Sequence, residues 1–167
     1  RLTFASRCRS PDAAPPSLPR YCLTMERLSF ATLVSPGTPA ARAQLLVSSI
    51  RHFGGRLAAS PIRVLLGEDP AEQPGWPEVR GALLSLGATI TPSVPAEAET
   101  EFPFFGKVAA AAAAEGQARG EDDLLVWLDA DTIVLREPSQ FLLPSTISLG
   151  CRPVHHRLIG PGWEEPL

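Results

Sequence analysis

Apolar residues recur along the chain with two alternating periods, which predict short strands separated by helices. Residues 28–34 are rich in apolar and β-branched side chains and predict a first strand, and the short apolar run at 62–66 is typical of a strand that is buried on both faces of a sheet. A weaker strand is predicted at 88–94, where Pro92 interrupts the run, and another strand begins at Leu124. Glycine, proline or acidic residues follow these runs, as is typical of the turns at strand ends.

Helical spacing of apolar residues fills the segments between these strands. A first helix is predicted over 39–53, where paired glycines follow it, and a second helix begins near Trp76 and stops at Gly87. A third helix is predicted from about 104 to 119, and its many alanines give it a high helix propensity and allow it to lie close to a sheet. The apolar stripes consist of Leu46, Ile50 and Phe53 in the first helix and of Val79, Leu83 and Leu86 in the second.

This alternation of strands and helices predicts an α/β fold with a Rossmann-like, mostly parallel sheet, right-handed crossovers and flanking helices. In such a sheet, the loops that follow successive strands meet at one edge, and here these loops are 35–38, 67–70 and 129–131. Further along the chain, residues 141–143 are predicted to pack back onto the core, and 146–149 to form another short strand.

Composition separates an N-terminal extension from this domain. Residues 1–24 are rich in arginine, serine and proline and contain a single acidic residue, so we expect them to be disordered. The simplest interpretation is that translation begins at Met25 and that the upstream residues have no structural role. Residues 25–167 are then expected to form one α/β domain.

Overall composition limits the class of protein. A hydrophobic content of 44% and a charged content of 20% are typical of a globular chain, and a net charge of −3 gives no reason to expect a nucleic-acid partner. No apolar run has the length of a transmembrane helix. Cys8, Cys22 and Cys151 have the spacing of neither a zinc site nor a disulfide framework, which favours reduced thiols and a cytoplasmic location.

The strand predicted at Leu124 runs into two aspartates, Asp129 and Asp131, before the chain turns apolar again at 132–135. In an extended segment this spacing places both carboxylates on one side of the backbone, where they repel each other unless a cation lies between them or one is protonated. Carboxylate oxygens suit Mg²⁺ or Mn²⁺, which take further ligands from water and substrate phosphates. A divalent-cation site is therefore predicted here, and the alternative is an ordinary strand-end turn.

With these flanks, the segment 126–132 resembles the Asp-x-Asp motif of GT-A glycosyltransferases, and the resemblance covers residues 28–150. Those enzymes use nucleotide-diphosphate sugars, and their motif binds a divalent cation on the diphosphate. The resemblance implies that this domain transfers a sugar from such a donor to an unknown acceptor, with Mn²⁺ or Mg²⁺ as cofactor. It also implies an apolar strand directly after the motif and a GT-A sheet that is incomplete at its C-terminal side.

The resemblance further implies roles for individual residues. Asp131 would be the main metal ligand, and Asp129 would bind the metal or the ribose. His155 or His156, within the basic cluster 152–157, is a candidate metal or substrate contact, although paired histidines beside arginines also occur as plain surface features. The expected nucleotide-sugar pocket consists of Ser35, Glu68 or the adjacent Asp69, Lys107, Asp129 and Ala130.

No residue after the aspartate pair stands out as a catalytic base, which leaves the acceptor and the stereochemical outcome open. We therefore expect either a nucleotide-binding part of a longer protein or a truncated gene product. A non-catalytic fragment that binds a nucleotide sugar without turnover is one alternative function.

A haloacid-dehalogenase-type phosphatase also has two aspartates at this spacing after a strand, as nucleophile and acid/base. Its motif lies near the start of the chain and ends in Gly-Thr or Gly-Val, whereas Thr132 and Ile133 follow the pair here. Dinucleotide and P-loop sites are excluded because residues 35–39 lack both glycine signatures.

Overall fold

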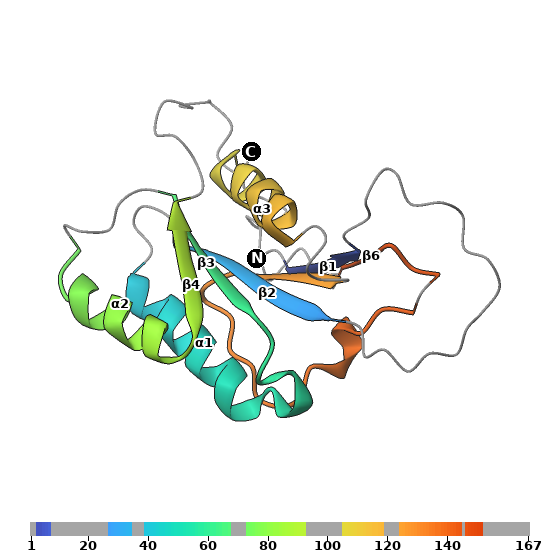
Figure 1. The fold of residues 1–167 in the computed structure, drawn as a ribbon, viewed down its shortest axis with the longest axis horizontal. Helices are drawn as coiled ribbons and strands as arrows, with labels where there is room; N and C mark the ends of the chain where they lie inside the picture. The colour runs from blue at the N-terminus through green and yellow to red at the C-terminus, as the bar shows by residue number, and fades with distance from the viewer. Residues whose placement is uncertain are drawn as a thin grey trace, which may run out of the picture.

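The computed structural model describes residues 3–7, 27–34, 39–67, 73–92, 105–118, 124–144 and 146–151. These residues form a six-stranded sheet with helices on both of its faces (Figure 1). The strands are β1 (Thr3–Arg7), β2 (Leu28–Val34), β3 (Ile62–Leu66), β4 (Ala88–Pro92), β5 (Leu124–Leu128) and β6 (Leu149–Cys151). The helices are α1 (Ala40–Phe53), α2 (Trp76–Ser85) and α3 (Phe105–Ala118), with short 3₁₀ turns η1 (Gly55–Leu57) and η3 (Ser139–Phe141).

The sheet has the strand order β4-β3-β2-β5-β1-β6, and its first four strands are parallel to one another. The chain steps outward from β2 to β3 and β4, and then returns to the other side of β2 as β5. The point between β2 and β5 is therefore the place where the direction of winding reverses. In open α/β sheets, ligands bind at the carboxyl ends of the strands at such a point. The predicted parallel α/β fold is confirmed.

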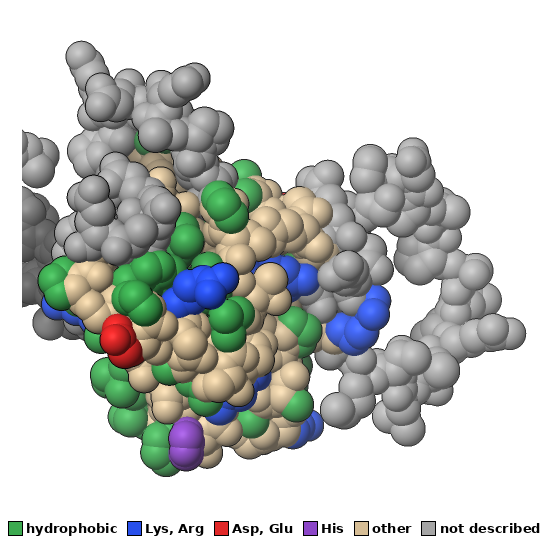
Figure 2. All heavy atoms as spheres, turned by 60° about the vertical axis from the view of Figure 1, so that its left-hand side comes forward, with side chains coloured by type: hydrophobic (Ala, Val, Ile, Leu, Met, Phe, Trp, Pro, Cys, Tyr) green, Lys and Arg blue, Asp and Glu red, His purple; other side chains and the backbone are tan. Residues whose placement is uncertain are grey.

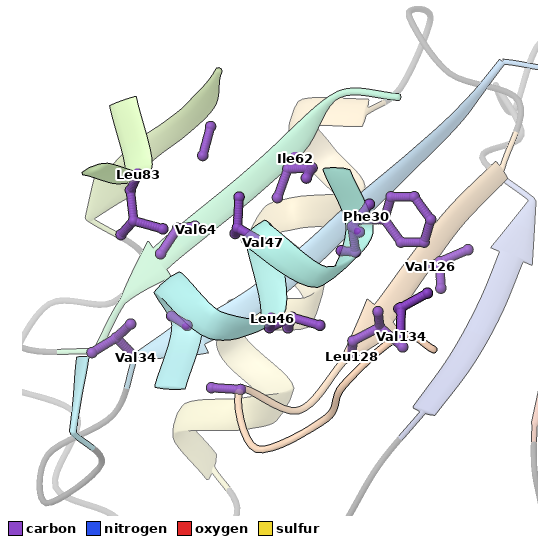
Figure 3. Close-up of a cluster of buried hydrophobic side chains, with 14 of the residues drawn as sticks. Phe30, Val34, Leu46, Val47, Ile62, Val64, Leu83, Val126, Leu128 and Val134 are labelled. Atoms are coloured by element: carbon purple, nitrogen blue, oxygen red, sulfur yellow. The ribbon is translucent and has the colours of Figure 1, made fainter. Parts of the chain in front are cut away.

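Helices α1 and α2 cover one face of the sheet, and the larger part of the core lies beneath them (Figures 1 and 3). Strands β2 and β3 are buried along almost their whole length, and their sequences are mostly apolar, with Ser29, Thr32 and Arg63 as buried polar exceptions. Figure 3 shows side chains of α1 pointing between those of the sheet strands. Members of this cluster include Phe30, Val34, Leu46, Val47, Ile62, Val64, Leu83, Val126, Leu128 and Val134.

Helix α3 covers the opposite face and contacts the sheet through alanines. Ala110, Ala114 and Ala118 recur at every fourth position, and each is fully buried. They pack against strand side chains that include Leu125 and Trp127. Because methyl groups are the largest side chains on this stripe, the helix backbone lies close to the sheet, as predicted.

Helix ends follow the glycines that the sequence singles out. Gly87 has a φ of +71° just after α2, and its N–H donates to the carbonyl of Leu84 at 2.9 Å. That φ favours glycine and closes the helix. At the end of α1, Gly54 donates to the carbonyl of Ile50 at 2.8 Å, and Gly55, with a φ of +58°, begins the 3₁₀ turn η1.

One prediction about the N-terminal extension is wrong. Residues Thr3–Arg7 form strand β1, which pairs antiparallel with β5 on one side and β6 on the other. Disorder was expected because the tail is poor in apolar side chains, but a strand inserted between two others is held by backbone hydrogen bonds on both edges, whatever its composition. The remaining residues of the predicted extension that precede Met25 lie outside the described part of the chain.

Two further expectations near the C-terminal side are corrected. Residues 132–135 were expected to form a strand after the aspartate pair, but they have no regular secondary structure. The last strand is β6 (Leu149–Cys151) rather than 146–149, because its register is set by pairing with β1 and not by its own apolar pattern. Residues 141–143 do pack against the core cluster as predicted.

Candidate functional site

The aspartate pair lies at the carboxyl end of β5, next to β2 at the point where the sheet reverses its winding. Strand β5 ends at Leu128, and Asp129 is the next residue. The loop that follows β2 begins with Ser35, which is outside the described residues. The fold therefore places the aspartates where parallel α/β sheets carry their ligand sites.

The segment that carries the two aspartates is a turn and not an extended strand. The backbone N–H of Thr132 donates to the carbonyl of Asp129 at 2.9 Å, which closes a four-residue turn over 129–132. The prediction that both carboxylates lie on one side of the backbone assumed that residues 129–131 are extended, and this assumption is wrong. The segment turns because the hydrogen bonds between β5 and its neighbouring strands end at Leu128, and a hydrogen bond within residues 129–132 takes their place.

The residues of this turn differ in their exposure to solvent. Asp129 is 8% exposed and Ala130 is 6% exposed, whereas Asp131 is exposed. A nearly buried carboxylate requires a charged or hydrogen-bonding partner, because loss of hydration is otherwise too costly. An exposed carboxylate has no such requirement and can contribute oxygens to a ligand that arrives from solvent.

Lys107 contacts Asp129. Its Nζ lies 3.1 Å from Oδ1 and 3.0 Å from Oδ2 of Asp129, so one ammonium donates to both carboxylate oxygens. Lys107 is in the first turn of α3, and its side chain is 30% exposed against 9% for that of Asp129. Hydrogen bonds between two charged groups are stronger than those between neutral groups. The structure thus brings together two residues, 22 positions apart, that were predicted to belong to one site.

The chain that leaves the aspartate turn is fastened to α1 by a buried serine. The N–H of Val134 donates to Ser49 Oγ at 3.0 Å, and the Ser49 hydroxyl donates to the carbonyl of Leu46 at 2.7 Å. Val134 also belongs to the main core cluster. Nothing in the sequence pattern predicts this contact, because Ser49 and Val134 are 85 positions apart.

An ion pair holds the same segment to the 3₁₀ turn η1 that follows α1. Glu137 accepts the backbone N–H of Arg56 at 3.0 Å and pairs with Arg56 Nε at 2.7 Å. The hydrogen bond from the Arg56 backbone N–H is the main cause of a lowered pKa of Glu137; desolvation opposes it, and the Arg56 side chain lowers the pKa further. Together with Ser49, this pair fixes the course of 132–137 and thereby the exit of the aspartate turn.

A cavity of about 560 Å³ lies beside the turn, under the segment that Ser49 and Glu137 hold. Leu128, which precedes the turn, and Thr132, its last residue, both line the cavity. Its other walls come from β1, from β6 and from residues 133–143, and are mainly apolar. The aspartates themselves are absent from its lining, so the cavity adjoins the charged site without containing it.

Several predicted site residues lie outside the described part of the chain: Ser35, Glu68, Asp69, His155 and His156. Within the described part, no three His, Cys, Asp or Glu side chains converge to hold a metal ion. The helices described there also include none long and apolar enough to span a membrane. On the face drawn in Figure 2, the Lys and Arg side chains of the described residues are interspersed with hydrophobic ones and form no single basic patch.

The four parallel strands, covered by helices on both faces, are consistent with a Rossmann-like glycosyltransferase fold. Comparison with protein families agrees. The model of the Rhodobacterales glycosyltransferase domain matches residues 30–160, and the chain belongs to this family. A search of curated proteins gave no match.

Proposed function

We propose that the domain is a GT-A-type glycosyltransferase that binds a nucleotide-diphosphate sugar at the carboxyl ends of β2 and β5 and transfers the sugar to an acceptor. Membership of a glycosyltransferase family supports the reaction class. The observation that carries the location is the pairing of Lys107 with Asp129 at the reversal point of the sheet, beside the exposed Asp131. An ammonium and two carboxylates at one edge supply the charges that a diphosphate and its counter-ion require.

The carboxylates fit a divalent cation of the Mn²⁺ or Mg²⁺ type. Such ions are commonly held by one or two protein carboxylates, with water and substrate phosphates completing the shell, so a cluster of three protein ligands is unnecessary. Asp131 is the exposed carboxylate and would be the main protein ligand. Asp129 is nearly buried and bonded to Lys107, so it would contact the cation or the ribose from the inner side of the turn.

The residues of the chain would act mainly by stabilising charge on the leaving group. Departure of the sugar leaves negative charge on the diphosphate, and a bound divalent cation would neutralise part of it. Lys107, in the first turn of α3, places a positive charge at the same edge of the sheet. The N-terminal end of α3 adds the partial positive charge of its backbone N–H groups.

Thermal denaturation with UDP, GDP or TDP, each with and without MnCl₂, tests this proposal. We expect one nucleoside diphosphate to raise Tm in a metal-dependent manner, because a ligand that binds only the folded state stabilises it. Asp131→Ala should abolish that increase, whereas Glu78→Gln, at an exposed position of α2, should keep it. If none of the three nucleotides raises Tm under either condition, the donor site is not where we propose it.

A non-catalytic binding domain would give the same thermal shift, and turnover separates it from an enzyme. Release of the nucleoside diphosphate from the matching nucleotide sugar, with water or a mixture of candidate acceptors, is the measurement. Binding without any release would identify a nucleotide-sugar-binding fragment. A covalent phosphate on Asp129 after incubation with a phosphoryl donor would instead favour the phosphatase alternative.

A further inference from the structure

We infer that Lys107 is an internal counter-ion for Asp129 that makes divalent-cation binding depend on a bound diphosphate. The inference rests on the proposed donor site, and it adds that the divalent cation binds tightly only when the diphosphate is bound. The Lys107 ammonium donates to both oxygens of Asp129. A divalent cation that approaches the turn then meets a carboxylate that is already neutralised and a positive charge close by.

The environment of the pair supports this competition. The Asp129 side chain is only 9% exposed, so its electrostatic interactions are less screened by water than those of a surface carboxylate. The Lys107 side chain is 30% exposed and enters the site from a different element, the first turn of α3. Its ammonium can therefore move toward solvent while Asp129 stays in place. A diphosphate brings enough negative charge to accommodate both the ammonium and a divalent cation.

The identity of the residue also fits this role. Lys107 is the sole lysine in a chain whose other basic side chains, apart from histidine, are all arginines. Lysine carries a compact point charge on a flexible stem, whereas arginine is a planar fork suited to fixed, bidentate pairs. Arg51, which donates to the carbonyls of Leu86 and Ser60, is an example of the fixed kind in this structure. A mobile point charge is what an exchange between a carboxylate and a phosphate requires.

Titration of Mn²⁺ into the protein without nucleotide, followed by the electron paramagnetic resonance signal of free Mn²⁺, tests the inference directly. We expect the wild type to bind Mn²⁺ weakly and Lys107→Met to bind it at least roughly tenfold more tightly. A neighbouring charge changes the affinity of a carboxylate for a proton by a comparable factor. Lys107→Arg keeps the positive charge and should stay close to the wild type. Thermal denaturation of each variant shows that it is folded, and Lys107→Gln serves if the methionine variant is not.

The second arm repeats the titration with UDP, GDP or TDP present. The wild type should then bind Mn²⁺ markedly more tightly than it does alone, whereas in Lys107→Met the two conditions should differ much less. Unchanged or weaker Mn²⁺ binding by the folded methionine or glutamine variant in the absence of nucleotide overturns the inference. If that happens while the wild type still shows a metal-dependent nucleotide shift, the donor site stands and the counter-ion role of Lys107 fails.

Discussion

Asp129 and Asp131 are two positions apart, yet they differ in burial and in their contact with Lys107, which suggests different roles in the site. Asp129 is nearly buried and bonded to Lys107, whereas Asp131, in the same turn, is exposed to solvent. The turn that separates them suggests that one carboxylate organises the interior of the site and the other meets the incoming ligand.

The ion pair between Glu137 and Arg56 gives a prediction about pH at the residue scale. The pKa of Glu137 is lowered in the folded protein, mainly by the Arg56 backbone N–H. The stability that this interaction contributes is therefore fully present above the unfolded pKa and is lost as pH falls through the folded value. We expect Glu137→Gln to lower Tm slightly near neutral pH, because the pair is solvent-exposed and screened.

The check is a series of thermal melts of both proteins from neutral pH down to well below 4.5, the ordinary value for glutamate. The difference in Tm between wild type and Glu137→Gln should shrink as the carboxylate becomes protonated. A difference that stays constant over this range would show that the charge of Glu137 contributes nothing to stability.

At the scale of elements, the site depends on how α1 holds the segment that follows the aspartate turn. Ser49 lies on the buried face of α1 and accepts a hydrogen bond from the Val134 N–H, while Glu137 is bound to Arg56 in the turn η1 that follows this helix. Helix α3 supplies Lys107 from the opposite face of the sheet. The aspartate turn is thus positioned by one helix on each face, which is why contacts distant in sequence matter to it.

The Ser49 contact yields a prediction with a matched control. Ser49→Ala removes the acceptor of a buried backbone N–H, and we expect it to lower the free energy of unfolding by about 1–3 kcal/mol. Ser85→Ala is the control, because Ser85 also donates to the carbonyl three residues earlier in its helix but is exposed. That change should stay within about 0.5 kcal/mol.

Urea denaturation of the wild type and both serine variants measures these differences. We also expect Ser49→Ala to weaken any metal-dependent nucleotide shift, since the exit of the aspartate turn is no longer fixed. Equal stabilities for the Ser49 and Ser85 variants would contradict the role assigned to Ser49.

At the scale of the whole molecule, the sequence predicts the parallel half of the sheet better than the rest. Strands β2 and β3 match their predicted ranges, because a strand that is buried on both faces has a mostly apolar sequence. Strand β1 was missed because its stability comes from neighbours distant in sequence. The start and end of β6 depend on β1 and were misplaced for the same reason.

Some features of the site could be predicted from the sequence, and others could not. The position of Asp129 at the end of β5 and its proximity to Lys107 follow from strand order and helix placement, which the pattern and the family resemblance indicate. The turn geometry of 129–132 and the contact of Ser49 with Val134 arise from specific backbone hydrogen bonds. No periodicity in the sequence encodes those bonds, so only the structure shows them.

The central claim is that a divalent cation and a nucleoside diphosphate bind together at the aspartate turn beside Lys107. Because Lys107 is the sole lysine, a protein labelled with [¹³C]lysine gives a single set of side-chain signals that reports on this position. With UDP, GDP or TDP present, Mn²⁺ should broaden the Lys107 Cε signal strongly, whereas diamagnetic Mg²⁺ should only shift it. A sharp, unmoved Lys107 signal under conditions where Mn²⁺ and the nucleotide are both bound would contradict the account.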